Sequence, residues 1–120
     1  MIVLSSFEIA RIAVKALDDK MARDIQILKT DKVTVLADYF ILCTATSDTH
    51  AKTLADETDK LLSEAGEPVL RREGYRSGGW TLLDYGCVIV HIFSEDMRAF
   101  YALDRLWSDA EKVEYTQMLQ

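Results

Sequence analysis

Two cysteines and two histidines are the side chains best suited to nucleophilic or metal chemistry in this chain. Neither Cys43 nor Cys87 stands on a glycine-flanked turn from strand to helix, the setting from which a nucleophile paired with histidine usually acts. Cys87 and His91 share one face of a predicted strand, but their spacing separates them by about 13 Å, too far for one zinc ion. We therefore expect separate buried thiols, no metal site and a packing role for His50.

Carboxylates could support metal-dependent phosphoryl transfer if two of them stood close together at a strand end. Asp38 and Asp84 are instead single acids at the ends of two different predicted strands, and no strand carries an Asp-x-Asp pair. The glycines at 78–79 lead into a strand, whereas a phosphate-binding loop opens a helix. The stretch 44–47 does enter a helix and is an alternative anion site, although plain helix capping explains it as well. The sequence predicts no cofactor and no enzymatic activity.

The composition is that of one folded domain with an acidic surface. Hydrophobic residues make up 49% of the 120 residues and the net charge is −6. Such a charge is repelled by nucleic-acid phosphates and favours a basic protein partner. No apolar run reaches the roughly 20 residues that cross a membrane, and residues 1–4 lack the basic start of a signal peptide. We expect a cytoplasmic protein.

Hydrophobic periodicity predicts alternating helices and strands over a single domain, residues 1–120. Ser5, Ser47 and Ser94 are placed to cap helices, and Gly66 is placed to end the second one. The expected order is a helix from residue 5, strands over 24–29 and 33–44, a helix over 47–65, strands over 69–73, 80–84 and 87–93, and a helix from residue 94. This α-β-β-α-β-β-β-α order predicts an α/β fold, a mixed sheet of about five strands with helices packed on it. Residues 111–120 show no clear pattern, and we expect this tail to fray.

The hairpin predicted over residues 80–93 has two faces of different composition. A two-residue loop of Tyr85 and Gly86 would place Trp80 opposite His91. One face then mixes aromatic, polar and aliphatic side chains: Trp80, Leu82, Asp84, Cys87, Ile89, His91 and Phe93. The other face is a cleaner core set: Thr81, Leu83, Val88, Val90 and Ile92. The mixed face has the composition of an interface centre. A helix that covers it, with Trp80 and His91 at the rim, explains the pattern equally well.

Three motifs in order make the chain similar to the Iojap-type ribosomal silencing factor family. The first covers residues 38–44 (Asp-Tyr-Phe-Ile-Leu-Cys-Thr) with Thr46-Ser47 after it, and the second runs from Glu73-Gly74 through 80–93. The third is a closing helix with matches at Arg98, Phe100, Tyr101, Leu103, Leu106 and Trp107. The resemblance spans about residues 6–110. Cys87 and Thr49 depart from it, since the family usually has an acid and a basic residue there.

The resemblance implies a nucleotidyltransferase-like fold without the catalytic acids. It also implies a translation repressor that binds the large ribosomal subunit and blocks its association with the small subunit. The implied partner is a basic ribosomal protein at the intersubunit face, large-subunit protein fourteen in the family, and family members also form homodimers. From the matched motifs and the mixed hairpin face, the candidate partner-binding residues are Trp80, Glu73, Asp84, Tyr85, His91, Asp38 and Tyr39.

Two other functions compete with the repressor hypothesis. A nucleotide-binding or nucleotidyl-transferring enzyme of related fold would need a carboxylate pair beside a glycine-serine turn, which the sequence lacks. A dimeric adaptor without a ribosomal role would be separated from a silencing factor by a pull-down from lysate.

Overall fold

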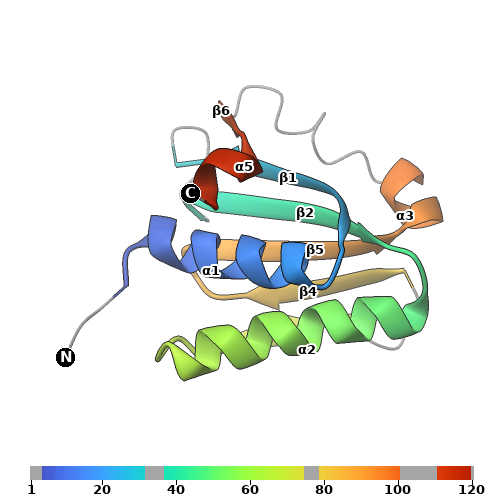
Figure 1. Cartoon of the computed structure of the whole chain (residues 1–120), viewed down its shortest axis with the longest axis horizontal. Coiled ribbons are helices and arrows are strands. Elements are labelled where there is room, and N and C mark those ends of the chain that lie inside the picture. Colours follow the sequence, from blue (N-terminus) through green and yellow to red (C-terminus); the bar gives the residue numbers. More distant parts are fainter. Residues whose placement is uncertain (1–3, 32–36, 75–78, 101–110, 120) are drawn as a thin grey trace.

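The computed structural model describes residues 4–31, 37–74, 79–100 and 111–119, and Figure 1 shows its elements. The helices are α1 (Ser6–Asp19), α2 (Asp48–Glu64), α3 (Glu95–Phe100) and α5 (Tyr115–Met118). The strands are β1 (Arg23–Lys29), β2 (Tyr39–Ala45), β3 (Arg71–Glu73), β4 (Trp80–Asp84), β5 (Val88–Ser94) and β6 (Glu111–Val113). The predicted order is confirmed from α1 to α3. Residues 33–36 of the second predicted strand, 75–78 of the glycine loop and 101–110 of the last predicted helix lie outside the described residues.

The strands form one mixed sheet in the order β3-β4-β5-β2-β1-β6. β2 and β5 run parallel, and the other neighbouring pairs run antiparallel. The mixed α/β class is confirmed, with six strands where about five were expected. The additional strand, β6, pairs with β1 along the sheet edge, in a segment where the sequence predicted no element.

Both long helices lie on the same side of the sheet (Figure 1). Ser5 caps α1 as predicted, in a capping box where the Ser5 hydroxyl accepts from the Glu8 N–H and the Glu8 carboxylate accepts from the Ser5 N–H. α2 is capped by Ser47, and Gly66 follows its end with a φ of 90°, a conformation that favours glycine. The sheet therefore has one face covered by α1 and α2 and another face that these helices do not reach.

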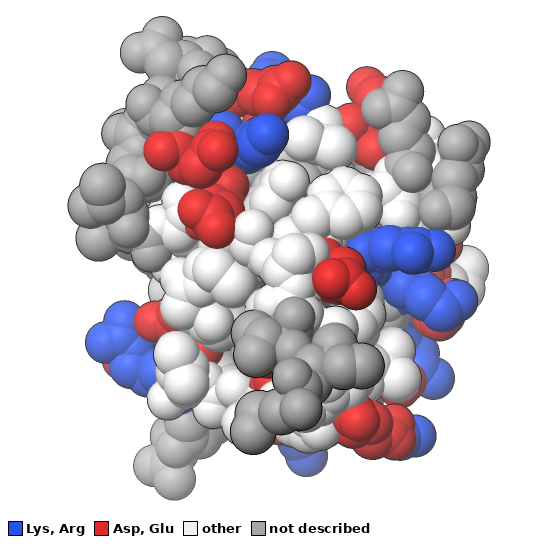
Figure 2. Space-filling model, turned by 90° about the vertical axis from the view of Figure 1, so that its left-hand side faces the viewer, with Lys and Arg blue, Asp and Glu red and all other residues white. Residues whose placement is uncertain are grey.

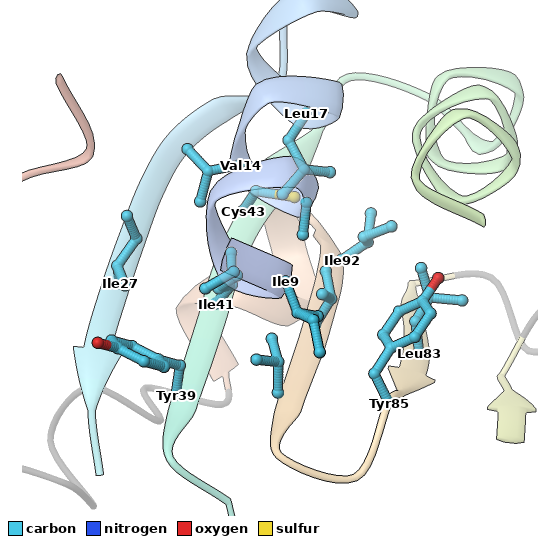
Figure 3. Close-up of a cluster of buried hydrophobic side chains, with 14 of the residues drawn as sticks. Ile9, Val14, Leu17, Ile27, Tyr39, Ile41, Cys43, Leu83, Tyr85 and Ile92 are labelled. Carbon is cyan, nitrogen blue, oxygen red and sulfur yellow. The ribbon is translucent and has the colours of Figure 1, made fainter. Parts of the chain in front are cut away.

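The main core lies between the sheet and the two long helices. Figure 3 shows side chains from α1, β1, β2, β4 and β5 pointing toward one another in this layer. Every residue of β2 is buried, as expected for a central strand whose two faces are both covered. β2 therefore supplies apolar side chains to both faces of the sheet.

The predicted register of the hairpin is wrong by two residues. Trp80 pairs with Phe93 and not with His91, and the Tyr85 N–H donates to the Val88 carbonyl at 2.9 Å. The two-residue loop is therefore Gly86-Cys87. Gly86 has a φ of 85°, so this loop gives the left-handed position to glycine and spares Tyr85 from it. Because side chains alternate with a period of two, the shift leaves the paired strand residues on their predicted faces. Cys87 is the exception: it lies in the loop and packs against the main core, whereas it was predicted on the mixed face.

Candidate functional site

The sheet face opposite α1 and α2 carries the mixed set of side chains predicted for the hairpin. We call it the aromatic face and define it by Phe40, Leu42, Trp80, Leu82, Ile89, His91 and Phe93. Trp80, Leu82 and Ile89 are half-buried, and the other members are buried. Among the described helices, α3 alone contributes to the apolar cluster here, through Met97. The half-buried trio is the part of this face that offers apolar surface.

The Trp80 indole contacts two rings and donates a hydrogen bond within the described part of the chain. Its Nε1–H donates to Nδ1 of His91 at 3.1 Å. The indole centroid lies 5.8 Å from the ring of His91 and 5.3 Å from the ring of Phe93. These contacts constrain both the ring plane and the direction of the N–H bond, so the indole has a defined orientation.

His91 is a buried, neutral hydrogen-bond acceptor. The side chain is 5% exposed, and because Nδ1 accepts from the indole, the neutral ring carries its hydrogen on Nε2. Nε2 has no hydrogen-bond partner within the described part of the chain. Burial lowers the pKa of His91 to about 4, because the imidazolium is poorly solvated there. The ring therefore stays neutral at physiological pH.

Charged groups stand along the β3–β4 side of the aromatic face. Arg71 Nε lies 3.4 Å from Glu73 Oε1, and its Nη2 lies 3.8 Å from Asp84 Oδ2. The Asp84 carboxylate also accepts from the Gly86 N–H at 2.8 Å and so stabilises the β4–β5 turn. The side chains of Arg71 and Glu73 are 61% and 56% exposed, so their ion pair adds little stability and both charges can meet a partner.

Asp38 precedes β2 at the same end of the sheet as the β4–β5 turn. Its N–H donates to the Cys87 carbonyl at 2.7 Å, and its carbonyl accepts from the Thr30 N–H at 2.8 Å. These bonds fix the backbone, and the half-buried Asp38 carboxylate adds to burial in raising the pKa of Cys87 and of Tyr39. The face and its border thus bring together four of the seven candidates, Trp80, His91, Asp84 and Glu73. Asp38 lies at the same end of the sheet as the β4–β5 turn.

The other two candidates, Tyr39 and Tyr85, belong to the core beneath the helices (Figure 3). They are 7% and 6% exposed. Burial is the main cause that raises the pKa of each phenol. The Tyr85 hydroxyl has no hydrogen-bond partner among the described residues. A direct role of these tyrosines in partner binding stays a prediction, and their placement does not favour it.

His50 joins three segments through its ring and backbone. Nδ1 accepts from the Thr46 N–H at 2.9 Å, and Nε2 lies 2.8 Å from the Lys20 carbonyl, to which it donates. The His50 N–H donates to the Ser47 hydroxyl at 3.0 Å. The packing histidine expected from the sequence is thus a polar link between the start of α2 and the end of α1. The Thr46 N–H already donates to His50, and the Ser47 hydroxyl caps α2. Helix capping is therefore sufficient to explain the stretch 44–47, for which the sequence also allowed an anion site.

Both cysteines are free thiols. Cys43 is buried, and burial raises its pKa to about 12. Burial also raises the pKa of the half-buried Cys87, and Asp38 and Glu67 add to this effect. The thiolate is the reactive form of cysteine, so these surroundings favour unreactive thiols.

Comparison with known proteins decides the family. A sequence profile described as "Ribosomal silencing factor during starvation" matches residues 4–120. The chain belongs to the ribosomal silencing factor family. It is 39% identical over 111 residues to a ribosomal silencing factor of Halalkalibacterium halodurans, across 92% of this chain and 95% of that protein. The factor of Bacillus subtilis is 40% identical over 102 residues, which cover 85% of this chain and 86% of that protein.

A solved structure supports the same assignment. The crystal structure of a protein from Chromobacterium violaceum matches with a TM-score of 0.85 and 36% identity, over 88% of each chain. The resemblance to silencing factors seen in the sequence motifs is therefore confirmed.

Sequence reasoning missed two residues at the aromatic face of this silencing factor. Phe40 lies 5.4 Å from His91, centroid to centroid, because β2 pairs with β5. Arg71 reaches Asp84 because β3 pairs with β4. Alternation groups the residues of one strand by face. Only the strand order shows which residues of neighbouring strands lie on the same face as Phe40 and Arg71.

The end of this silencing-factor domain that holds the β4–β5 turn is largely uncharged, with acidic and basic groups around it (Figure 2). Leu70, which is 72% exposed, lies beside this turn: a Cβ on Gly86 would be 3.3 Å from Leu70 Cδ1. Phe7 on α1 is 45% exposed, on the helix side of the sheet. No helix in the described ranges is both long and apolar enough to span a membrane.

Proposed function

We propose that this chain binds the large ribosomal subunit through its aromatic face and so prevents the small subunit from joining, which represses translation in the cytoplasm. The half-buried group of Trp80, Leu82 and Ile89 carries the proposal. An aromatic anchor among apolar side chains, with polar groups at the border, is the usual composition of an interface centre. Membership of the ribosomal silencing factor family supports a ribosomal target.

The partner we propose is a basic protein at the intersubunit face of the large subunit. Glu73 and Asp84 bring carboxylates to the border of the aromatic face, and Asp38 adds an acidic residue at the end of the sheet that holds the β4–β5 turn. The whole chain has a net charge of −6, which favours contact with a basic protein and opposes contact with RNA phosphates. Recognition is therefore proposed to be protein to protein.

We further propose a binding role without catalysis, on a fold related to nucleotidyltransferases. What supports this is the placement of the acids at the strand ends. Asp38 precedes β2 and Asp84 ends β4, and β5 lies between these strands in the sheet. Metal-dependent nucleotidyl transfer uses carboxylates that stand close together around the metal ions, whereas a strand separates these two acids.

Sedimentation with isolated ribosomal subunits tests the proposal. The protein should sediment with large subunits, not with small subunits, and should lower the yield of joined ribosomes when both are mixed. Binding should weaken as salt rises, because contacts between acidic and basic groups are screened over about 8–10 Å at physiological ionic strength. Equal sedimentation with both subunits, or unchanged joining at saturating protein, would contradict it.

A further inference from the structure

We propose that His91 is a positioning residue for partner binding: its neutral ring fixes the Trp80 indole in the orientation that the large subunit recognises. The inference rests on the proposed function and names the group that sets the geometry of the same face. His91 itself is buried, so it acts through Trp80 and not by touching the partner.

The hydrogen bond between the two rings is what selects the indole orientation. Trp80 is the first residue of β4, is half-buried, and has its ring in contact with His91 and Phe93. The bond from its Nε1–H to His91 Nδ1 at 3.1 Å fixes the edge of the indole that carries the N–H. Because the acceptor is buried, water competes poorly for it.

The acceptor is itself held rigidly. The His91 ring stacks on Phe93 with an interplanar angle of 8°, and its centroid lies 5.4 Å from that of Phe40. Its backbone lies in the interior strand β5, paired with β4 on one side and β2 on the other. A rigid acceptor orders the indole before the partner arrives, which lowers the entropy lost on binding.

The chemistry of this position also argues against a role in packing alone. His91 is among aromatic rings, and its Nε2–H is buried without a hydrogen-bond partner among the described residues. A buried donor without a partner is unfavourable, so phenylalanine would fill the same space at lower cost. Nδ1 is the atom that phenylalanine cannot replace, and its contact is Trp80.

Two substitutions at His91 separate the acceptor from the ring. His91→Phe keeps an aromatic ring and removes the acceptor. His91→Asn loses the ring but carries an oxygen on Cγ, where Nδ1 is attached, so it can accept from the same indole. We expect His91→Phe to fold and to bind large subunits about tenfold more weakly, and His91→Asn to recover most of that loss.

A second readout reports on the indole directly. In an ¹H–¹⁵N spectrum, the Trp80 indole resonance, identified by its loss in Trp80→Phe, should shift in His91→Phe and return toward its wild-type position in His91→Asn. Trp80→Phe also removes the donor and leaves the buried histidine intact, so it should weaken binding to a similar extent. This variant keeps the test valid if His91→Phe fails to fold.

The outcomes separate the inference from the proposed function. If Trp80→Ala weakens binding but His91→Phe and Trp80→Phe bind like wild type, the positioning role is wrong and the binding face stands. Equal losses for His91→Phe and His91→Asn would show that ring volume matters and not the acceptor, which also overturns the role. If Trp80→Ala binds normally, the proposed face is wrong, and the inference is wrong with it.

Discussion

At the scale of single residues, the aromatic face depends on one histidine that must remain uncharged. His91 Nδ1 accepts from Trp80, and a protonated ring has no acceptor to offer. The lowered pKa of His91, about 4 where the unperturbed value is 6.5, comes from burial. In the unfolded chain this burial is absent, so the unfolded state binds a proton more tightly than the folded state.

This difference makes stability depend on pH in a defined window. The contribution of neutral His91 is fully present above pH 6.5 and is lost as the pH falls toward the folded pKa of about 4. We expect the free energy of unfolding to fall by about 2 kcal/mol more in wild type than in His91→Phe between pH 7 and pH 5. Denaturant unfolding of both proteins across this range would check it. Parallel pH dependences would show that His91 is not buried as described.

Part of the candidate site could be predicted from the sequence alone. Alternation placed Trp80, Asp84 and His91 on one face correctly, although the register was two residues off, since an even shift preserves the face. Alternation along the hairpin would have placed Tyr85 apart from Trp80, whereas the face of Tyr39 relative to Trp80 depends on the strand order. Both tyrosines were chosen as candidates from the family motifs, and a motif does not say which of its residues point outward.

At the scale of elements, long periodic segments were predicted well and short edge segments were not. α1 and α2 carry caps and an apolar stripe, and β2 is apolar on both sides. β6 has three residues, two of them charged and exposed, so it has no alternating pattern to detect. Its pairing with β1 depends on a neighbour distant in sequence.

The last described helix, α5, provides a test of whether the tail of residues 111–120 is ordered. Met118 in α5 is 1% exposed and packs in the main core, whereas Met21 is 80% exposed. Met118→Ala should lower the free energy of unfolding by about 2–4 kcal/mol, because it leaves a cavity in the core. Met21→Ala should change it by less than about 0.5 kcal/mol. Denaturant melts of both variants compare them, and a silent Met118→Ala would show that the tail frays as the sequence suggested.

At the scale of the whole molecule, function depends on which sheet face the helices cover. The sequence predicted two faces of different composition but left open whether a helix covers the mixed one. Among the described elements, both long helices, α1 and α2, pack on the cleaner face (Figure 1), and α3 reaches the mixed face through Met97. Strand order depends on the parallel pairing of β2 with β5, two segments joined by more than 40 residues of intervening chain, which local patterns cannot show.

The central claim is that the aromatic face holds the large subunit, and a pair of aromatic truncations tests it most directly. Trp80 lies on this face, and Phe7 lies on α1, on the other side of the sheet, with 45% of its surface exposed. Trp80→Ala should remain cooperatively folded in a thermal melt and lose about 2 kcal/mol of binding to isolated large subunits, roughly thirtyfold in Kd. Phe7→Ala should bind like wild type. Wild-type affinity in Trp80→Ala, or an equal loss in Phe7→Ala, would contradict the account.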